Sequence, residues 1–373
     1  MATQRVYLDY NATTPVKPAV ARAVAAALAE PGNPSSVHAE GRRARRMVED
    51  ARQALAAAIG TEPRRIVFTS GGTEANALAL KGCGRRRVIV SAVEHASVLG
   101  AVPGCAVVPC DRHGVVRLEA LDAALAGGGE DAVLSVMLAN NETGVIQPVA
   151  EAVEIARARG ALVHVDAAQA PGRVPLSVAE LGADFVTVSA HKMGGPPGIG
   201  ALVVAGSADV TPQALGGGQE LGRRAGTEAV ALIAGFGVAA SLIADDLADA
   251  ARIAGLRDRF EAAIARDAPD AVVHGQEVAR LPNTSSIGMA GVAAATQVMA
   301  LDLAGFAVSA GSACSSGKVG RSHVLAAMGL GEAEAGCAIR VSLGWRSIVS
   351  EVDEFVAAWR ALHVRLGRTR AAA

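Results

Sequence analysis

Residues 160–204 read GALVHVDAAQAPGRVPLSVAELGADFVTVSAHKMGGPPGIGALVV, and this stretch decides the fold. Two apolar runs in it, 161–165 and 184–188, are rich in Val and bounded by turn signals, so both are predicted to be buried strands. Ligands of open parallel α/β sheets bind beyond the carboxyl ends of the strands. The sequence therefore predicts a ligand site formed by the polar residues that follow the two runs, namely Asp166, Gln169, Ser189, His191 and Lys192.

A lysine at the edge of an apolar sheet is costly unless it is paired, exposed or chemically used. One chemical use is a Schiff base with pyridoxal phosphate, in which a carboxylate such as Asp166 holds the pyridinium nitrogen protonated. The other interpretation is a salt bridge between Lys192 and an acid at the strand ends, without chemistry. The stretch by itself leaves both open.

HVDAAQ, followed by SAHKMGGPPGIGAL, resembles the pyridoxal-phosphate core of the cysteine desulfurases, within the fold-type I aminotransferase group. The resemblance runs from Tyr7 to about Arg365. It implies an α/β fold of the fold-type I PLP-dependent transferases, with pyridoxal 5'-phosphate as cofactor. It also implies a large cofactor-binding domain, residues 14–248, with a mainly parallel sheet flanked by helices. A smaller α+β domain, residues 1–13 and 249–373, would carry the nucleophilic cysteine loop.

A second candidate element lies nearer the N-terminus. Residues 65–70 read as a strand, and the glycine turn 71–76 then opens a helix. Free backbone N–H groups at a helix start favour an anion, although no Gly-Lys-Ser/Thr follows, which excludes a P-loop. In the light of the resemblance, Gly72 and Thr73 are expected to donate to the cofactor phosphate.

Two further strands, 87–91 and 132–138, are followed by His95 and Asn141. A lone histidine is most often a satisfied surface or core residue. The resemblance instead implies that His95 stacks on the cofactor ring and moves protons. It implies that Asn141 and Gln169 address the ring oxygen, and that Ser189 and His191 join the phosphate site.

The stretch 215–227, LGGGQELGRRAGT, is predicted to be a flexible loop or tight turn because it is rich in glycine. The resemblance implies that Thr227 at its end reaches the cofactor phosphate of a neighbouring subunit, and therefore that the protein is a homodimer. This chain has RAGT where many relatives have RSGT.

Residues 308–323, VSAGSACSSGKVGRSH, discriminate between the reactions that the cofactor supports. Small residues flank Cys314, and Lys318, Arg321 and His323 could favour its thiolate. The residues alone also allow an inert cysteine in a turn. SAGSACSS resembles the nucleophile loop of the longer-loop cysteine desulfurases, which implies conversion of L-cysteine to L-alanine with the sulfur held on Cys314 as a persulfide.

Two residues are expected to bind the substrate carboxylate. GNPSS at 32–36 resembles a family loop whose Asn, here Asn33, touches that group, and Arg340 in AIRVS matches the family's bidentate arginine. Without the resemblance, a turn residue and a surface arginine would be favoured.

Composition restricts the remaining possibilities. The net charge of −1 argues against electrostatic binding of nucleic acid or an anionic membrane. The sequence contains no run of about 18 uncharged apolar residues, so we expect no transmembrane helix. The N-terminus lacks a signal-peptide pattern. The five cysteines are widely spaced without C-x-x-C pairs, so we expect neither a metal site nor disulfides. Free thiols and the missing signal pattern together predict a cytoplasmic protein.

Several alternatives stay open. SSGKVGRSH after Cys314 departs from many relatives, and the end RLGRTRAAA lacks the tail by which some relatives dock an iron–sulfur scaffold. The sulfur acceptor, such as an iron–sulfur scaffold, is therefore undetermined. Rival functions are an aminotransferase or a selenocysteine lyase on the same fold, and a non-catalytic scaffold that binds partners.

Overall fold

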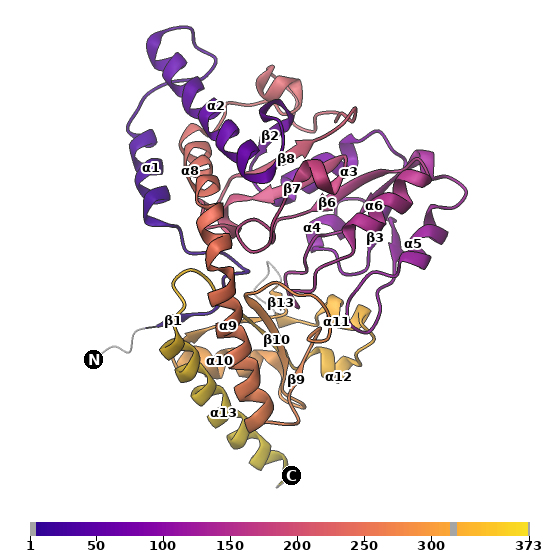
Figure 1. Ribbon diagram of the computed structural model, residues 1–373, viewed down its shortest axis with the longest axis vertical. Coiled ribbons are helices and arrows are strands. Elements are labelled where there is room, and N and C mark those ends of the chain that lie inside the picture. Colours follow the sequence, from indigo (N-terminus) through magenta and orange to yellow (C-terminus); the bar gives the residue numbers. More distant parts are fainter. Residues whose placement is uncertain (1–4, 314–318, 372–373) are drawn as a thin grey trace.

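The structure is a computed structural model that describes residues 5–313 and 319–371. Its larger part is a seven-stranded sheet with helices on both faces, in the upper half of Figure 1. The strand order is β2-β8-β7-β6-β5-β3-β4. The strands are β2 (Ile66–Thr69), β3 (Arg87–Ser91), β4 (Ala106–Val108), β5 (Ala132–Ser135), β6 (Leu162–Asp166), β7 (Phe185–Ser189) and β8 (Gly200–Val204).

The sheet is mainly parallel, as predicted. β4, β3, β5, β6 and β7 pair in parallel, whereas β8 pairs antiparallel with both β7 and β2. The apolar runs of the sequence coincide with the strands to within about one residue, except that β5 ends at Ser135 instead of Leu138. Beyond Ser135 the backbone still donates from Val136 to His164 and from Leu138 to Asp166, but a regular ladder is not kept.

Both faces of this sheet are buried, which explains why its strands are continuous apolar runs. Ile89 of β3 faces the core packed by α2 (Ala39–Ile59) and α8 (Val230–Ser241), and its neighbours Val88 and Val90 face the opposite core under α3 (Gly72–Gly82). The other helices of this part are α1 (Pro18–Leu28), α4 (Ala96–Leu99), α5 (Leu118–Leu125), α6 (Val149–Ala158) and α7 (Val178–Leu181).

A smaller antiparallel sheet, of order β12-β15-β10-β9, occupies the lower half of Figure 1. Its core gathers Val6 and Leu8 from the N-terminal lead-in with Trp359 from the last helix. The lead-in strand β1 (Val6–Tyr7) pairs in parallel with β11 (Phe306–Ala307). The remaining elements are β9 (Val272–Val273), β10 (Thr284–Gly288), α10 (Ala294–Leu303), β12 (Ser309–Ala310), β13 (Ser312–Ala313), β14 (Val319–Gly320), α11 (His323–Ala327), α12 (Glu332–Ala335), β15 (Ala338–Ser342) and α13 (Val349–Ala371).

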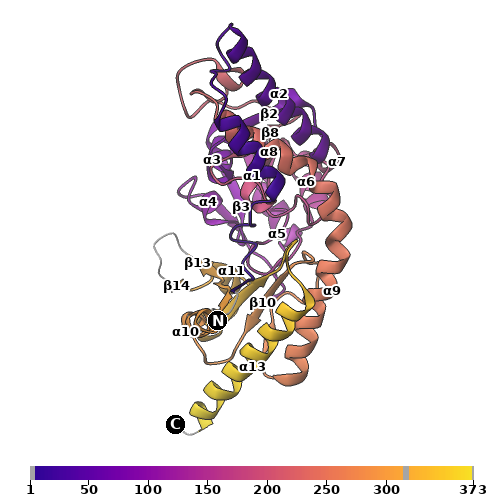
Figure 2. The ribbon, with the colours of Figure 1, turned by 90° about the vertical axis from the view of Figure 1, so that its left-hand side faces the viewer.

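The helix α9 (Ile243–Asp267) passes from the large sheet to the small one, as Figure 2 shows. The sequence predicts one helical stretch from Glu228 to about Arg266, but the helix breaks at Leu242. The hydroxyl of Ser241 donates to the carbonyl of Gly237 at 3.0 Å, and such a bond back to residue i−4 often bends a helix. The boundaries 13/14 and 248/249 between two domains stay a prediction.

Among the described residues, no single helix is both long and apolar enough to cross a membrane. The pair α8 and α9 meets those criteria of length and composition only when the two are taken together, and it is bent by 54°.

Candidate functional site

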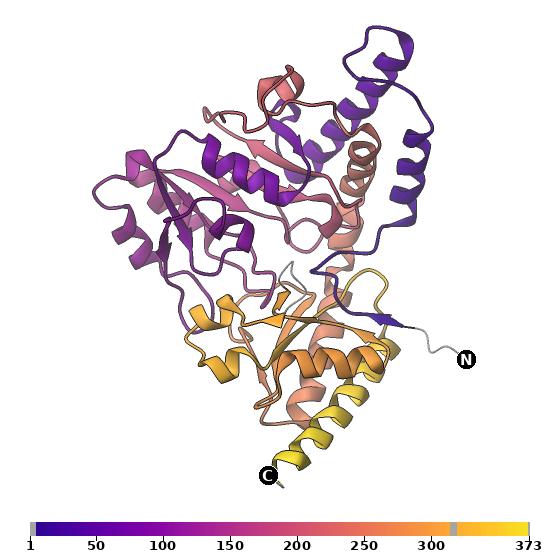
Figure 3. The ribbon, with the colours of Figure 1, turned by 180° about the vertical axis from the view of Figure 1, so that it is seen from behind.

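The candidate site begins at the carboxyl ends of two neighbouring parallel strands, β6 and β7, at one edge of the large sheet. Asp166 is the last residue of β6 and pairs with Thr187 of β7. Ser189 ends β7, and a single 3-10 turn, Ala190–Lys192, follows directly. The structure thus brings Asp166, Ser189 and Lys192 together at one edge of the large sheet. The view from behind in Figure 3 shows the larger part of the fold above the smaller one.

The amine of Lys192 is held by backbone carbonyls and, within the described ranges, not by a carboxylate. Its Nζ donates to the carbonyl of Asn11 at 2.6 Å and to that of Ala12 at 2.9 Å. Burial, and then the positive charges of Arg340 and Arg173, lower the pKa of Lys192 to about 7. A large fraction of this amine is therefore neutral and nucleophilic near neutral pH. No salt bridge of Lys192 occurs within the described ranges, so the interpretation as a plain strand-end ion pair does not hold.

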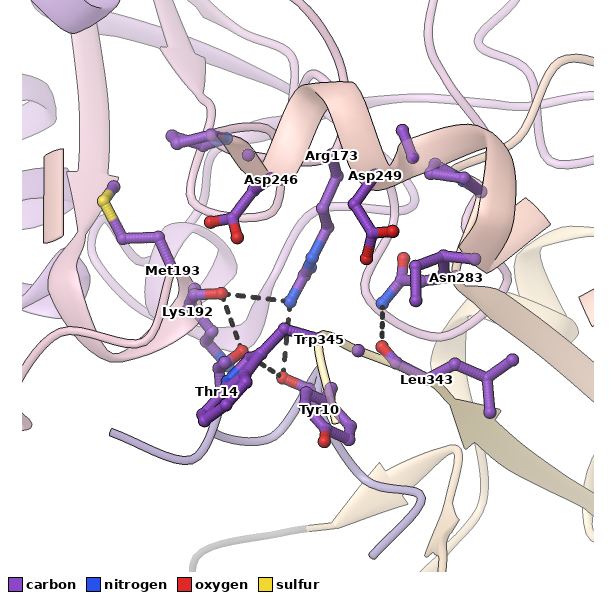
Figure 4. Close-up of a pocket in the computed structure, with 16 residues that line it drawn as sticks. Tyr10, Thr14, Arg173, Lys192, Met193, Asp246, Asp249, Asn283, Leu343 and Trp345 are labelled. Atoms are coloured by element: carbon purple, nitrogen blue, oxygen red, sulfur yellow. Dashed lines mark hydrogen bonds between the residues drawn. The ribbon is translucent and has the colours of Figure 1, made fainter. Parts of the chain in front are cut away.

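Arg173 fixes the backbone that carries Lys192 (Figure 4). Its guanidinium donates to the carbonyl of Lys192 at 3.2 Å and to that of Tyr10 at 3.3 Å. The hydroxyl of Thr14 donates to the same Lys192 carbonyl at 2.8 Å. A cavity of about 50 Å³ adjoins these groups, lined in part by Trp345, and it is far smaller than usual ligand pockets.

Asp166 belongs to a hydrogen-bonded chain that ends at His95. The Asp166 carboxylate accepts from the side chain of Asn76 at 2.8 Å and from the backbone of Ala168 at 3.0 Å. Asn76 also donates to the hydroxyl of Ser97 at 2.9 Å, and that hydroxyl lies 2.8 Å from Nδ1 of His95. Because the backbone N–H of Ser97 donates to the same Nδ1 at 3.1 Å, the neutral ring carries its proton on Nε2. Desolvation lowers the pKa of His95, which favours the neutral ring, although the residue as a whole is exposed.

A second acid, Glu94, is fully buried near this hydrogen-bonded network. Its carboxyl group accepts from the hydroxyl of Ser91 at 2.7 Å and from the backbone of Met137 at 2.6 Å. Burial, with the negative charge of Asp166 contributing, raises the pKa of Glu94 to about 8. Glu94 is thus mostly uncharged at neutral pH and adds no second negative charge beside Asp166.

The predicted phosphate site contains unused donors. Among the described residues, the buried hydroxyl of Ser189 has no hydrogen-bond partner, and no side chain caps the free N–H groups of α3, which begins at Gly72. A Cβ on Gly72 would lie 3.7 Å from that of Ser189, so the two sets of donors are adjacent. The close approach of the two segments requires a glycine at position 200. A Cβ at Gly200 would lie 2.8 Å from the Cα of Gly71 and would collide with it. A buried unpartnered hydroxyl beside an uncapped helix start suits a phosphate group.

Asn11 connects the other predicted residues. Its carbonyl accepts from Gln169 at 3.0 Å as well as from Lys192, and its side chain donates to the carbonyl of Asn141 at 3.1 Å. Arg340 donates to that Asn141 carbonyl at 3.0 Å and to the carboxylate of Asp9 at 2.7 Å, and its Nε has no hydrogen-bond partner in the part of the chain that the structure describes. Gln169 also accepts from Arg173, and Nδ1 of His191 lies 3.2 Å from the hydroxyl of Thr13.

No hydrogen bond in the described part of the chain joins the side chain of Asn33, Thr73 or Thr227 to this group. Asn33 lies in the exposed turn between α1 and α2, where its side chain accepts from the backbone of Ser35 at 2.9 Å. Thr227 and Thr73 are exposed, and no hydrogen bond joins the side chain of Thr227 to the start of α3 among the described residues. Cys314 lies outside the described residues.

The sequence analysis missed three residues that hold the site together: Asn11, Asn76 and Arg173. Asn76 lies one turn after Gly72, on the helix that was assigned to the phosphate. Arg173 lies within the opening stretch, where its spacing from Lys192 gives no sign that the two meet. Asn11 belongs to the polar lead-in, and its partners are up to 331 residues away in sequence, so no local pattern identifies it.

Comparisons with known proteins agree with this geometry. The aminotransferase class-V family matches residues 6–355. The chain is 39% identical to an IscS-like cysteine desulfurase of Mycobacterium tuberculosis, with 98% of each protein covered. It is 41% identical to a cysteine desulfurase of Cereibacter sphaeroides, with 95% of this chain and 94% of that protein covered. Among solved structures, a NifS-like protein from Rickettsia africae superposes with a TM-score of 0.90 at 36% identity, covering 96% of this chain and 99% of that one.

Proposed function

The chain belongs to the class-V aminotransferase family and is a pyridoxal-phosphate-dependent cysteine desulfurase, and from this premise we propose which of its residues carry out the reaction. The observation that supports the proposal most is the amine of Lys192, whose pKa of about 7 leaves a large fraction of it neutral near neutral pH. This amine lies at the same sheet edge as Asp166 and the hydroxyl of Ser189, which has no hydrogen-bond partner among the described residues.

Pyridoxal phosphate supplies an electron sink for the carbanion that forms at the substrate Cα. Lys192 would hold the cofactor through its amine and would move the proton at the substrate Cα. Asp166, held by Asn76, would pair with the ring nitrogen. Gly72, Thr73, Ser189 and His191 would hold the phosphate, and His95, Gln169 and Asn141 would contact the ring. Arg340 binds the substrate carboxylate and Asn33 assists.

The sulfur transfer needs no external oxidant. The thiolate of Cys314 attacks the sulfur of the substrate, so that an S–S bond forms and the C–S bond breaks. The electron pair of the C–S bond stays with carbon, which is then protonated to give alanine, and Cys314 keeps the sulfur as a persulfide. The substrate carbon is thereby reduced and its sulfur is oxidised to the persulfide level.

Measurement of the products of the purified enzyme with L-cysteine tests this function. With a reductant present, we expect alanine and sulfide in equal amounts, without any α-keto acid. A requirement for an α-keto acid would indicate an aminotransferase. Turnover of selenocysteine alone would indicate a selenocysteine lyase, and the absence of any turnover would favour the partner-binding scaffold.

We propose further that two copies of the chain share their sites, with Thr227 of each reaching the phosphate of the other. The loop before Thr227 is anchored from inside by Glu220, whose buried carboxylate accepts twice from Arg52 at 2.9 Å and once from the backbone of Phe68 at 2.9 Å. The same loop leaves Leu215 and Leu221 82% and 76% exposed. Large exposed apolar side chains on an anchored loop suit an interface with a second copy.

Mixed dimers separate the two possible placements of Thr227. Thr227→Ala should weaken cofactor binding about tenfold or more, since a hydrogen bond to a charged group contributes about 1.5–3 kcal/mol. A dimer of one Thr227→Ala and one Lys192→Ala chain would keep one site with both residues intact if Thr227 acts across the interface. We therefore expect one tight cofactor site per mixed dimer in a binding titration. If none is recovered, or if the active enzyme is a monomer, the shared site is wrong.

We also propose the compartment in which the reaction takes place and the kind of protein that receives the sulfur. Cys83, Cys105, Cys110 and Cys337 are free thiols, which suits a reducing compartment such as the cytoplasm. The persulfide sulfur would pass to an acceptor protein, such as an iron–sulfur scaffold.

A further inference from the structure

Glu142 is a buried acid for which the reaction described above has no use. It lies in the turn after β5, next to Asn141, and its side chain is almost fully buried. Burial raises the pKa of its carboxyl group, which the nearby His323 and Arg340 lower in part. No ion pair of Glu142 occurs within the described ranges. Burying a carboxyl group without a charged partner costs free energy, so its place in the fold needs an explanation.

The carboxyl group of Glu142 meets both ends of the hairpin that carries Cys314. The hairpin is formed by β13 and β14, in which Ser312 pairs with Gly320. On one side, the hydroxyl of Ser322 donates to Oε2 of Glu142 at 2.5 Å. On the other side, a Cβ on Gly311 would lie 2.5 Å from the same Oε2, so the backbone at Gly311 packs directly against it. One oxygen of the large-sheet part thus contacts the residues on both sides of the hairpin.

A second bond ties the same region to the predicted ring-stacking residue. Ser322 also caps α11 by accepting from the backbone of Leu325 at 3.0 Å. The first residue of α11, His323, places its Nε2 2.9 Å from the carbonyl of Glu94, the neighbour of His95. In Figure 2, β13, β14 and α11 lie at the top of the smaller sheet, below α4 of the larger part. The hairpin is therefore fixed to the part of the fold that carries the predicted cofactor residues.

We infer that Glu142 is a positioning residue for sulfur transfer, which holds Gly311 and Ser322 against the large-sheet part and so fixes the two points from which the segment with Cys314 extends. The inference rests on the proposed function, because it concerns the step in which Cys314 takes up sulfur. Binding of the cofactor and removal of the Cα proton depend on Lys192 and Asp166, which Glu142 does not contact by any hydrogen bond in the described ranges. Loss of Glu142 should therefore slow the transfer of sulfur to Cys314 and leave cofactor binding and removal of the Cα proton unchanged.

Glu142→Ala tests the inference in the holoenzyme. We expect alanine formation in a single turnover to fall about 10- to 100-fold, because a misplacement of about 1 Å can cost about 10²-fold. Cofactor affinity and exchange of the Cα proton of bound amino acid, followed by NMR in D₂O, should stay within about twofold of wild type. Glu142→Gln, which still accepts from Ser322, should restore the rate to within about threefold of wild type.

Gly311→Ala provides a second variant that does not depend on the stability of Glu142→Ala. Its new Cβ collides with the Glu142 carboxyl group, so we expect a similar loss of rate in the wild-type background and little further loss in Glu142→Ala. Equal losses in both backgrounds would show that the contact has no role. Ser322→Ala should also slow the step, whereas Ser177→Ala, which removes the serine cap of α7 far from the hairpin, should not.

The failure of this inference can be distinguished from failure of the proposed function. If the wild-type enzyme makes no alanine from cysteine, the function itself is wrong. If it does, and Glu142→Ala forms alanine at the wild-type rate or loses cofactor binding and proton exchange in proportion, only the positioning role of Glu142 is overturned.

Discussion

Lys192→Ala should abolish turnover of cysteine, with a loss of at least about 10³-fold, because proton transfer by a positioned group alone contributes about 10²–10⁴-fold. The variant also loses the amine that binds the cofactor covalently. The chain has four lysines, Lys17, Lys81, Lys192 and Lys318. Of these, Lys17 is engaged with Asp246 at 2.5 Å, whereas Lys192 is held by backbone carbonyls and has no counterion among the described residues.

The assignment has two direct measurements. Borohydride reduction of the holoenzyme followed by peptide mapping should place the cofactor on Lys192, and Lys81→Ala, at an exposed position, serves as the matched control. The rate at which the apoenzyme takes up cofactor should rise as the pH passes through about 7, because the neutral amine replaces the ammonium form above its pKa. Cofactor found on another lysine, or a rate that is flat from pH 6 to 8, would contradict the role of Lys192.

Cys314→Ala is the second variant with a large expected effect. It should leave cofactor binding and exchange of the Cα proton intact, because those steps use Lys192 and Asp166. It should form alanine at least about 10³-fold more slowly than wild type, because the attacking thiolate is gone. The measurement is single-turnover alanine formation beside proton exchange on the same sample.

Cys105→Ala is a matched control for that variant. Cys105 is a partly exposed free thiol in the large-sheet part, and its removal should leave both rates unchanged. Burial raises the pKa of the Cys83 and Cys110 thiols, so neither supplies a ready thiolate near neutral pH. Full activity of Cys314→Ala would therefore require a different mechanism of sulfur transfer.

Local sequence patterns predicted most of the large sheet, because strands buried on both faces are apolar throughout and end at polar residues. Asp166 and Ser189 could be placed at one edge for that reason. The break of the helical stretch at Leu242 could not be predicted in the same way, since it follows from a side-chain bond of Ser241 in a sequence without Pro or Gly at that point.

The support around the site was harder to predict than the site itself. Asn11 contacts Lys192, Gln169 and Asn141 through bonds that span from 130 to 181 residues, and such contacts leave no periodic signal. Arg173 bonds to the carbonyl of Lys192, and Glu142 bonds to the hydroxyl of Ser322. Both contacts depend on the tertiary fold. Composition identifies the two residues only as a charged residue in a loop and a polar residue in a turn.

Mass spectrometry of the peptide that contains Cys314 tests the central claim most directly. Wild-type holoenzyme given L-cysteine without reductant should gain the mass of one sulfur atom or more on this peptide, together with alanine, and subsequent reductant should remove the added mass. The account is contradicted if the sulfur is found instead on Cys83, Cys105, Cys110 or Cys337, or if alanine forms while the Cys314 peptide keeps its original mass.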